Sequence, residues 1–166
     1  MDTQEKYLPF QKSHFFADGS SMRMPVEGTV ARGQLREDVA YFIGKNEDGS
    51  FIKTNPLELT MEVMERGQQR FSIYCAPCHD QTGAGQGLTV KKGFMPPPSF
   101  HLDRIRVFSD GYYYDVISNG IRNMPSYKAQ VPVDDRWAIV AYMRALQKSQ
   151  NASKEDVPEE IRSGIK

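Results

Sequence analysis

This sequence lacks a long apolar run, a net charge and a third cysteine, and each absence excludes a class of protein. The longest apolar candidate, Trp137 to Met143, is far shorter than the roughly 20 residues that a membrane-spanning helix needs. The 21 basic and 21 acidic residues cancel, so the charge gives no indication of nucleic acid or an anionic membrane surface as a partner. Two cysteines and three histidines also do not supply the paired cysteine knuckles of a usual structural zinc site.

The remaining composition predicts a soluble globular protein with much irregular structure. A length of 166 residues is enough for one domain with something left over. The apolar fraction is 39% and the charged fraction 25%, beside ten prolines and thirteen glycines. These values fit a folded domain that carries long loops.

One short motif, CAPCH at residues 75–79, carries most of the chemical information. Two cysteines three positions apart, with a histidine directly after the second, are typical of a c-type haem attachment site. In such a site the thiols of Cys75 and Cys78 form thioether bonds to the haem vinyl groups, and His79 ligates the iron. A thioredoxin-like dithiol would need a βαβ context, which the surrounding pattern does not show. With both cysteines bound to one haem c, none remains for a disulfide or a lipid anchor.

The beginning of the chain does not match this interpretation. The first ten residues, MDTQEKYLPF, contain neither a basic segment nor an apolar one, so no signal peptide is visible. Covalent haem attachment takes place on the outer side of the energy-transducing membrane. We therefore expect that an export segment has been removed, or that the numbered chain starts after it.

The periodicity of apolar residues predicts three helices, near residues 60–74, 110–118 and 133–148. Thr60 and Ser109 are suitable N-caps for the first two, and Pro132 directly precedes the third. Gly67 inside the first helix costs roughly 1 kcal/mol relative to alanine, which favours a close crossing with another helix. The stretch VAYFI at 39–43, followed by the turn-like NEDG at 46–49, is compatible with a small hairpin.

Three parts follow from this pattern. Residues 1–59 are expected to form an extended N-terminal arm, because they contain many aromatic residues but no regular periodicity. The arm could cover its own domain or wrap a partner subunit, and we expect the partner. Residues 60–148 are expected to form the haem domain, and 149–166 a flexible C-terminal tail.

The pieces around the motif, taken in order, resemble class I cytochrome c. They are a Gly67-x-x-x-Phe71 pattern ahead of Cys75, a Met-Pro loop at Met124, and a final helix that carries Ala141-Tyr142. The resemblance covers residues 60–148 and implies an all-α haem-c fold in which the first and last helices cross. Asp80 departs from the glycine that often follows the histidine in these domains, which puts little in doubt.

A narrower resemblance concerns the segments MPVEGTVARG at 24–33, GIRNMPSY at 120–127 and DRWAIVAY at 135–142. They are similar to the monohaem cytochrome c subunit of bacterial alternative complex III, a membrane quinol:electron-acceptor oxidoreductase. This resemblance implies partner subunits in a multihaem membrane complex and a terminal oxidase or small electron carrier as acceptor. It implies a location on the extracytoplasmic, periplasmic face of the membrane, held there through partner subunits.

Several residues are candidates for the axial ligands of the iron and for the hydrogen bond that orients His79. The resemblance to class I cytochromes assigns the carbonyl of Pro98 as acceptor for the second ring nitrogen of His79, unless the prolines only stiffen their loop. Met124 is expected to be the sixth ligand. Met95 lies only ~10 Å of extended chain from Pro98, so it is expected not to round the haem edge, and His101 follows the proximal loop too directly.

One-electron transfer is the function that these residues favour, with the chain acting as an electron carrier and not as an enzyme. A His79–Met124 pair leaves no open position on the iron, and no acid–base constellation converges elsewhere. Two alternatives stay open: a peroxidase-like haem with a labile sixth site, and a mainly structural subunit of the complex.

Overall fold

A computed structural model describes residues 3–162 and 164, and it divides into two compact units. The first unit ends at Arg36 and the second begins at Glu37. The described residues contain helices and isolated bridges but no strand. No described helix is long and apolar enough to cross a membrane. The helices are α1 (Val39–Ile43), α2 (Met61–Tyr74), α3 (Ala76–His79), α4 (Leu88–Lys91), α5 (Asp103–Arg106), α6 (Asp110–Asn119), α7 (Val133–Ser149), a 3₁₀ turn (Lys154–Asp156) and α8 (Glu159–Arg162).

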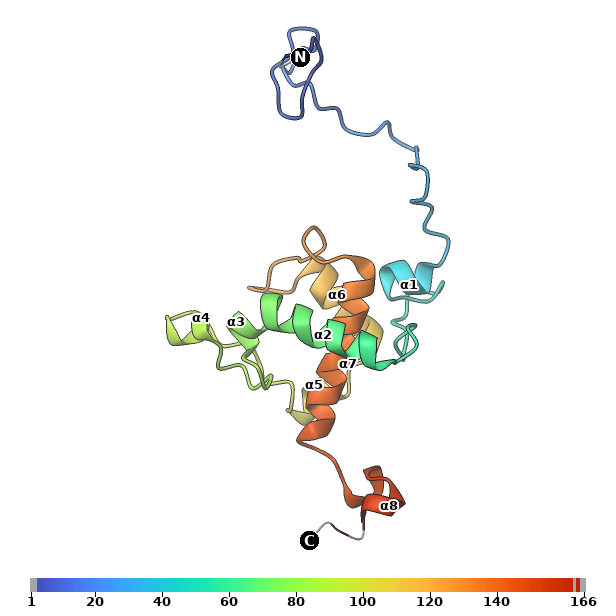
Figure 1. Cartoon of the computed structure of the whole chain (residues 1–166), viewed down its shortest axis with the longest axis vertical. Helices are drawn as coiled ribbons and strands as arrows, with labels where there is room; N and C mark the ends of the chain where they lie inside the picture. Colours follow the sequence, from blue (N-terminus) through green and yellow to red (C-terminus); the bar gives the residue numbers. More distant parts are fainter. Residues whose placement is uncertain (1–2, 163, 165–166) are drawn as a thin grey trace. The chain divides into compact units, whose positions relative to one another are not determined.

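The crossing of α2 and α7 organises the second unit (Figure 1). At the crossing point a β carbon on Gly67 would lie 2.1 Å from the carbonyl oxygen of Ala138, so only glycine lets the two backbones approach this closely. An ion pair also joins the two helices, since Asp135 of α7 accepts hydrogen bonds from the guanidinium of Arg66 of α2 at 2.6 and 2.9 Å. The predicted close crossing at Gly67 is confirmed.

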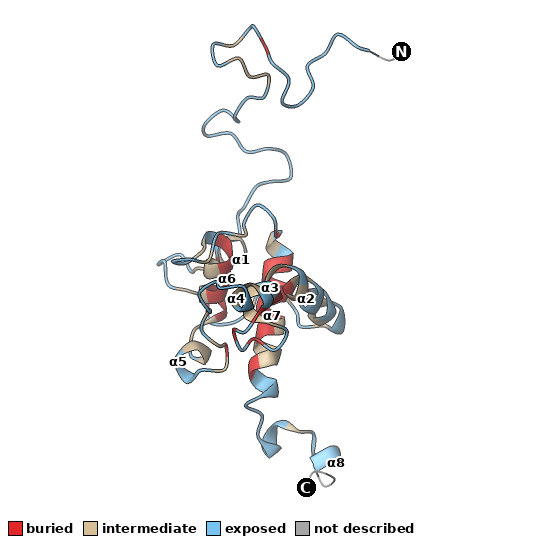
Figure 2. Cartoon of the chain, turned by 90° about the vertical axis from the view of Figure 1, so that its left-hand side faces the viewer, coloured by how far each residue is buried: buried red, intermediate tan, exposed pale blue. Residues whose placement is uncertain are grey.

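The core surrounds the first half of α7, where every residue from Asp135 to Ala141 is buried (Figure 2). Trp137 is fully buried and stacks on Tyr114 of α6, with ring centroids 4.1 Å apart. Phe71 of α2 is also fully buried and contacts the ring of Tyr142. Burying aromatic rings of this size stabilises a small domain by several kcal/mol, so α2, α6 and α7 form its packed centre.

The segment from Glu37 to residue 59 belongs to the helical unit, although the sequence indicated an arm that extends to 59. The indole nitrogen of Trp137 donates to the carbonyl of Tyr41 at 2.8 Å, and the side chain of Asn55 donates to the carbonyl of Trp137 at 2.8 Å. Residues 39–43 are helical and not the strand of a hairpin, because Asp38 caps the amide of Tyr41. The turn itself exists, closed by the bridge between Lys45 and Phe51.

The first unit is irregular but contains one closed loop, residues 8–21. The amide of Ser13 donates to the carbonyl of Gly19 at 2.9 Å, and the bridge between Lys12 and Ser20 lies beside it. Phe10 and Phe15 project from the loop and are 90% and 83% exposed. Residues 1–2 of the predicted arm, and 163, 165 and 166 of the predicted tail, lie outside the described part of the chain.

Candidate functional site

The CAPCH motif forms a helical turn that continues directly from α2. The amide of Cys75 donates to Phe71 O at 2.8 Å and caps α2, and the amides of Cys78 and His79 then donate to Cys75 O at 3.1 and 2.9 Å. This turn places the two thiols and the imidazole one after another at the end of a rigid helix. Both cysteines are half-buried free thiols.

Burial changes the protonation of both kinds of group. Burial, and to a lesser degree the neighbouring Cys78, raises the pKa of the Cys75 thiol to about 12. Burial lowers the pKa of His79 to about 4, with the carboxylate of Asp80 opposing the shift. At neutral pH the imidazole of His79 is therefore uncharged, which is the form that binds a metal.

Asp80 organises the loop that follows the motif, a role that the sequence analysis missed. Its carboxylate accepts hydrogen bonds from the amides of Thr82 at 2.7 Å and Gln86 at 2.7 Å, and from the hydroxyl of Thr82. These bonds outweigh partial burial and lower the pKa of Asp80 to about 2. The signal was visible in the sequence, since an aspartate two residues before a threonine commonly closes a turn.

The loop returns to the motif and packs against its carbonyls. The amide of Gly85 donates to His79 O at 2.9 Å, and that of Gly87 donates to Cys78 O at 3.1 Å. Beyond it, the hydroxyl of Thr89 lies 3.2 Å from the sulfur of Cys78. The loop thus encloses the motif on one side.

The proline segment passes against this loop. A β carbon on Gly85 would lie 2.4 Å from Pro97 O and 3.7 Å from the carbonyl carbon of Pro98. The Nδ1 atom of His79 is buried and makes no hydrogen bond within the described part of the chain. Pro98 is thus near the loop that holds His79, and its predicted role as acceptor stays a prediction.

Met124 lies in a tight turn between α6 and α7. Its amide and carbonyl pair with Ile121 at 2.9 and 3.0 Å, and its side chain is partly buried against the core. Gly120 (φ 78°) makes the turn fit, because a β carbon there would lie 2.5 Å from Met124 O. Burial raises the pKa of Tyr127 in the same loop, and Cys78 and Cys75 raise it further, so this loop lies close to the cysteines.

Met95 contacts the residue that precedes Met124. Its side chain is 76% exposed, yet its sulfur lies 3.5 Å from the side-chain nitrogen of Asn123. Met95 thus lies beside the loop that carries Met124, and the expectation that it does not reach the iron stays a prediction. His101 contacts the loop that follows the motif, with its Nε2 atom 2.8 Å from Thr82 O.

The residues present fit a covalently attached haem better than a free metal ion. No group of three histidine, cysteine or acidic side chains that could hold an ion occurs among residues 3–162 and 164. Tyr74, Cys75, Met124 and Tyr127 all pack against the apolar core. Two thiols, a neutral imidazole and a methionine loop beside this apolar surface match the donors and the low-polarity surroundings of a c-type haem.

Comparison with known proteins finds similarity to cytochrome subunits. Residues 62–143 match the family model described as cytochrome C oxidase, cbb3-type, subunit III. The chain is 28% identical over 124 residues to a cytochrome bc1 complex cytochrome c subunit from Corynebacterium efficiens, a match that covers 74% of this chain and 34% of the relative. The chain thus spans about a third of the length of that curated relative.

Two solved structures are distant likenesses. One is a Kuenenia stuttgartiensis reducing HAO-like protein complex, at 24% identity and a TM-score of 0.49, covering 58% of this chain and 49% of that one. The other is cytochrome CL from Methylophaga aminisulfidivorans, at 20% identity and a TM-score of 0.47, covering 84% and 85%. The family match and the helical structure confirm the predicted all-α fold of class I cytochrome c.

Proposed function

We propose that this chain, whose residues 62–143 form a cytochrome c domain, carries single electrons on one covalently bound haem c within a respiratory membrane complex. The observation that carries the proposal is the CAPCH turn at the end of α2, since Cys75 of this turn and Met124 pack against the same apolar core. When bound, the haem supplies a reversible one-electron couple. The protein supplies attachment, orientation and the exclusion of water.

Each predicted site residue has one task in this proposal. Cys75 and Cys78 hold the haem covalently, and the neutral imidazole of His79 and the thioether of Met124 hold the iron. Pro98 accepts a hydrogen bond from Nδ1 of His79, which would satisfy a buried nitrogen that has no other partner among the described residues and fix the orientation of the ring. With both axial positions filled, the chain exchanges electrons and offers no iron site to a substrate.

We further propose that the complex is a quinol:acceptor oxidoreductase like alternative complex III. The support is the resemblance of residues 24–33, 120–127 and 135–142 to its monohaem subunit. Partner subunits would hold the chain on the extracytoplasmic, periplasmic face and pass electrons through it to a terminal oxidase or a small carrier. The exposed Phe10 and Phe15 of the closed loop 8–21 are aromatic residues of the kind that dominate binding at protein interfaces.

Spectra of the purified chain, expressed with a c-type haem attachment system, test the core of the proposal. We expect one covalent haem per chain that is lost in a Cys75→Ala, Cys78→Ala double variant, and the weak long-wavelength band of methionine-ligated ferric haem. A ferric spectrum without that band, together with rapid binding of peroxide or cyanide, would support a labile sixth site instead.

A deletion tests the assembly. A chain without residues 1–36 is expected to keep its redox-active haem but to separate from the complex during purification. A deleted chain that stays in the complex would contradict the proposed role of the arm.

A further inference from the structure

The proximal histidine is held on one face by the ring of Phe100. The two rings stack with centroids 4.6 Å apart and planes 23° apart, and Phe100 is 7% exposed. Gly83 makes room for this ring, because a β carbon there would lie 2.6 Å from it. Phe71 of α2 meets the other part of the ring at an edge, 6.1 Å between centroids. The position of His79 therefore depends on where Phe100 lies.

The backbone of Phe100 is itself fixed by two hydrogen bonds, one at its amide and one at its carbonyl. Its amide donates to Gly83 O at 2.9 Å, and its carbonyl accepts a hydrogen bond from Nε2 of Gln147 at 3.1 Å. Gln147 lies near the end of α7 and is 5% exposed. A buried glutamine with its donor directed at a loop carbonyl is costly unless every bond is formed.

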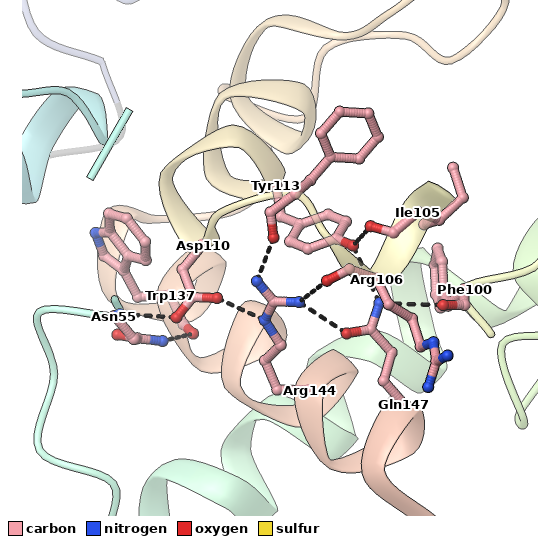
Figure 3. A network of polar contacts seen from close by, with 10 residues as sticks. Asn55, Phe100, Ile105, Arg106, Asp110, Tyr113, Trp137, Arg144 and Gln147 are labelled. Atoms are coloured by element: carbon pink, nitrogen blue, oxygen red, sulfur yellow. Dashed lines mark hydrogen bonds and ion pairs between the residues drawn. The ribbon is translucent and has the colours of Figure 1, made fainter. Parts of the chain in front are cut away.

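Gln147 is itself held in a network of polar contacts (Figure 3). Its Nε2 atom also donates to the hydroxyl of Tyr113 at 3.0 Å, and its Oε1 atom accepts from Arg144 at 2.9 Å. The hydroxyl of Tyr113 donates to Ile105 O. Gln147 thus has both donors and its acceptor engaged in one geometry.

Arg144 anchors the same network to the rest of the loop. Its guanidinium donates to Asp110 at 2.6 Å and to Arg106 O at 3.1 Å, as well as to Phe108 O. Asp110 also accepts from the amide of Asn55 at 2.8 Å. The C-terminal half of α7 therefore holds the segment from 100 to 110, which contains only the single turn of α5, through three carbonyl oxygens and the carboxylate of Asp110.

We propose that Gln147 is a positioning residue for the iron ligand, acting through Phe100 to fix the imidazole of His79 and keep water from it. The inference rests on the proposed function, since it takes His79 as the proximal ligand. If the Phe100 carbonyl is released, the ring can leave the imidazole and water can approach. Water near the ligand stabilises the more highly charged ferric state and lowers the reduction potential.

The test uses the haem-loaded full chain with Gln147→Met, which preserves length and apolar volume but forms no equivalent bonds. We expect the equilibrium constant for haem reduction to fall at least threefold and the paramagnetically shifted proton signals of the His79 ring to move. Asn55→Ala is the matched control. It removes the 2.8 Å bond to Trp137 O at the other end of the network, so it should lower Tm without moving potential or proton signals.

A double-variant cycle with Phe100→Leu shows whether Gln147 acts through that ring. In the Phe100→Leu background, Gln147→Met is expected to add no further change of potential. An unchanged potential in Gln147→Met, or an equal shift with and without Phe100, overturns the inference. Should Gln147→Met fail to fold, Tyr113→Phe removes one bond to Gln147 and is expected to shift the potential the same way by less, with no shift again overturning the inference.

These outcomes are separable from failure of the proposed function. A wild-type chain that binds no covalent haem, or whose His79→Ala variant keeps the same ferrous and ferric spectra, would contradict the proposed function before Gln147 is considered.

Discussion

Met124 and Met95 lie on neighbouring loops, and their burial distinguishes them as candidate ligands. Met124 is partly buried against the core in a turn that Gly120 makes tight, whereas the side chain of Met95 is 76% exposed. A thioether that is already oriented and shielded loses less entropy on binding iron than a mobile one. This difference, and not the length of chain, supports Met124.

Met124→His is expected to keep the covalent haem but lower the reduction potential, because imidazole stabilises ferric iron better than a thioether does. A redox titration with visible spectra measures this. Met95→Leu is the control, and its potential and its methionine–iron band should match wild type. If Met95→Leu loses the band and Met124→His keeps it, the assignment of the two methionines is reversed.

Asp80→Ala should destabilise the haem-loaded domain by about 2 kcal/mol, because a charged acceptor of several loop bonds is lost. Asp48→Ala removes a comparable turn-closing carboxylate, bonded to Ser50, on the turn between Lys45 and Phe51. That control should cost less, since its turn does not pack against the CAPCH motif. Chemical denaturation of both variants decides the matter, and equal losses would show that Asp80 has no particular role beside the motif.

At the scale of elements, the helices that carry the site could be predicted because their signals are local. Thr60 accepts the hydrogen bond from the amide of Val63 that its N-cap role predicts, and α2 and α7 begin and end within one residue of the expected bounds. Helix α1 could not be predicted, since its apolar residues are stabilised by distant contacts such as Trp137 to Tyr41 O. The proximity of Met95 to Asn123 was missed for the same reason.

Gly67→Leu is expected to lower the free energy of unfolding by about 1–3 kcal/mol or more, because overpacking a close crossing forces the helices apart. The control Glu65→Leu adds the same side chain to the exposed side of α2. Thermal melts of the haem-loaded variants are compared. If Gly67→Leu is as stable as Glu65→Leu, the close crossing of α2 and α7 at Gly67 does not contribute to stability.

The stability of the C-terminal turn, Lys154–Asp156, is expected to depend on pH. The amino group of Lys148 and the amide of Ser153 lower the pKa of Asp156 from its usual 3.8 to about 2. A lowered folded-state pKa contributes stability that is present above about 4 and is lost as the pH falls through about 2. Amide proton shifts of residues 153–157 should report this loss between those values.

Asp156→Asn should remove that titration, because it has no ionisable carboxyl group, while Glu159→Gln should leave it unchanged. The same acid transition in Asp156→Asn as in wild type would show that another group controls the turn.

At the scale of the whole molecule, the boundary between the units differs from the predicted one. Residues 37–59 contribute α1 and Asn55 to the helical unit, so the irregular part ends at Arg36. The sequence could not show this, because the hydrogen bonds that hold the segment join residues more than 80 positions apart. Whether residues 1–36 bind a partner stays a prediction.

Limited proteolysis of the isolated chain should cut within residues 1–36 and leave a resistant fragment that starts near Glu37, since the helical unit is packed around α7. Mass spectrometry of the fragments identifies the cleavage sites. Within the assembled complex the same sites are expected to be protected. If residues 1–36 of the isolated chain resist as long as residues 60–148, the arm packs on its own chain.

The position of α7 after the CAPCH motif and after α1 to α6 has a consequence for haem attachment. Tyr41, Asn55, Gly67 and Phe100 all contact this helix, so the helical unit cannot close until α7 is present. Before that packing the two thiols are open to the enzymes that attach haem, whereas in the folded chain burial raises the pKa of the Cys75 thiol and disfavours its ionised form. The order of the elements along the chain thus suits attachment of the cofactor before α7 packs against the rest of the unit.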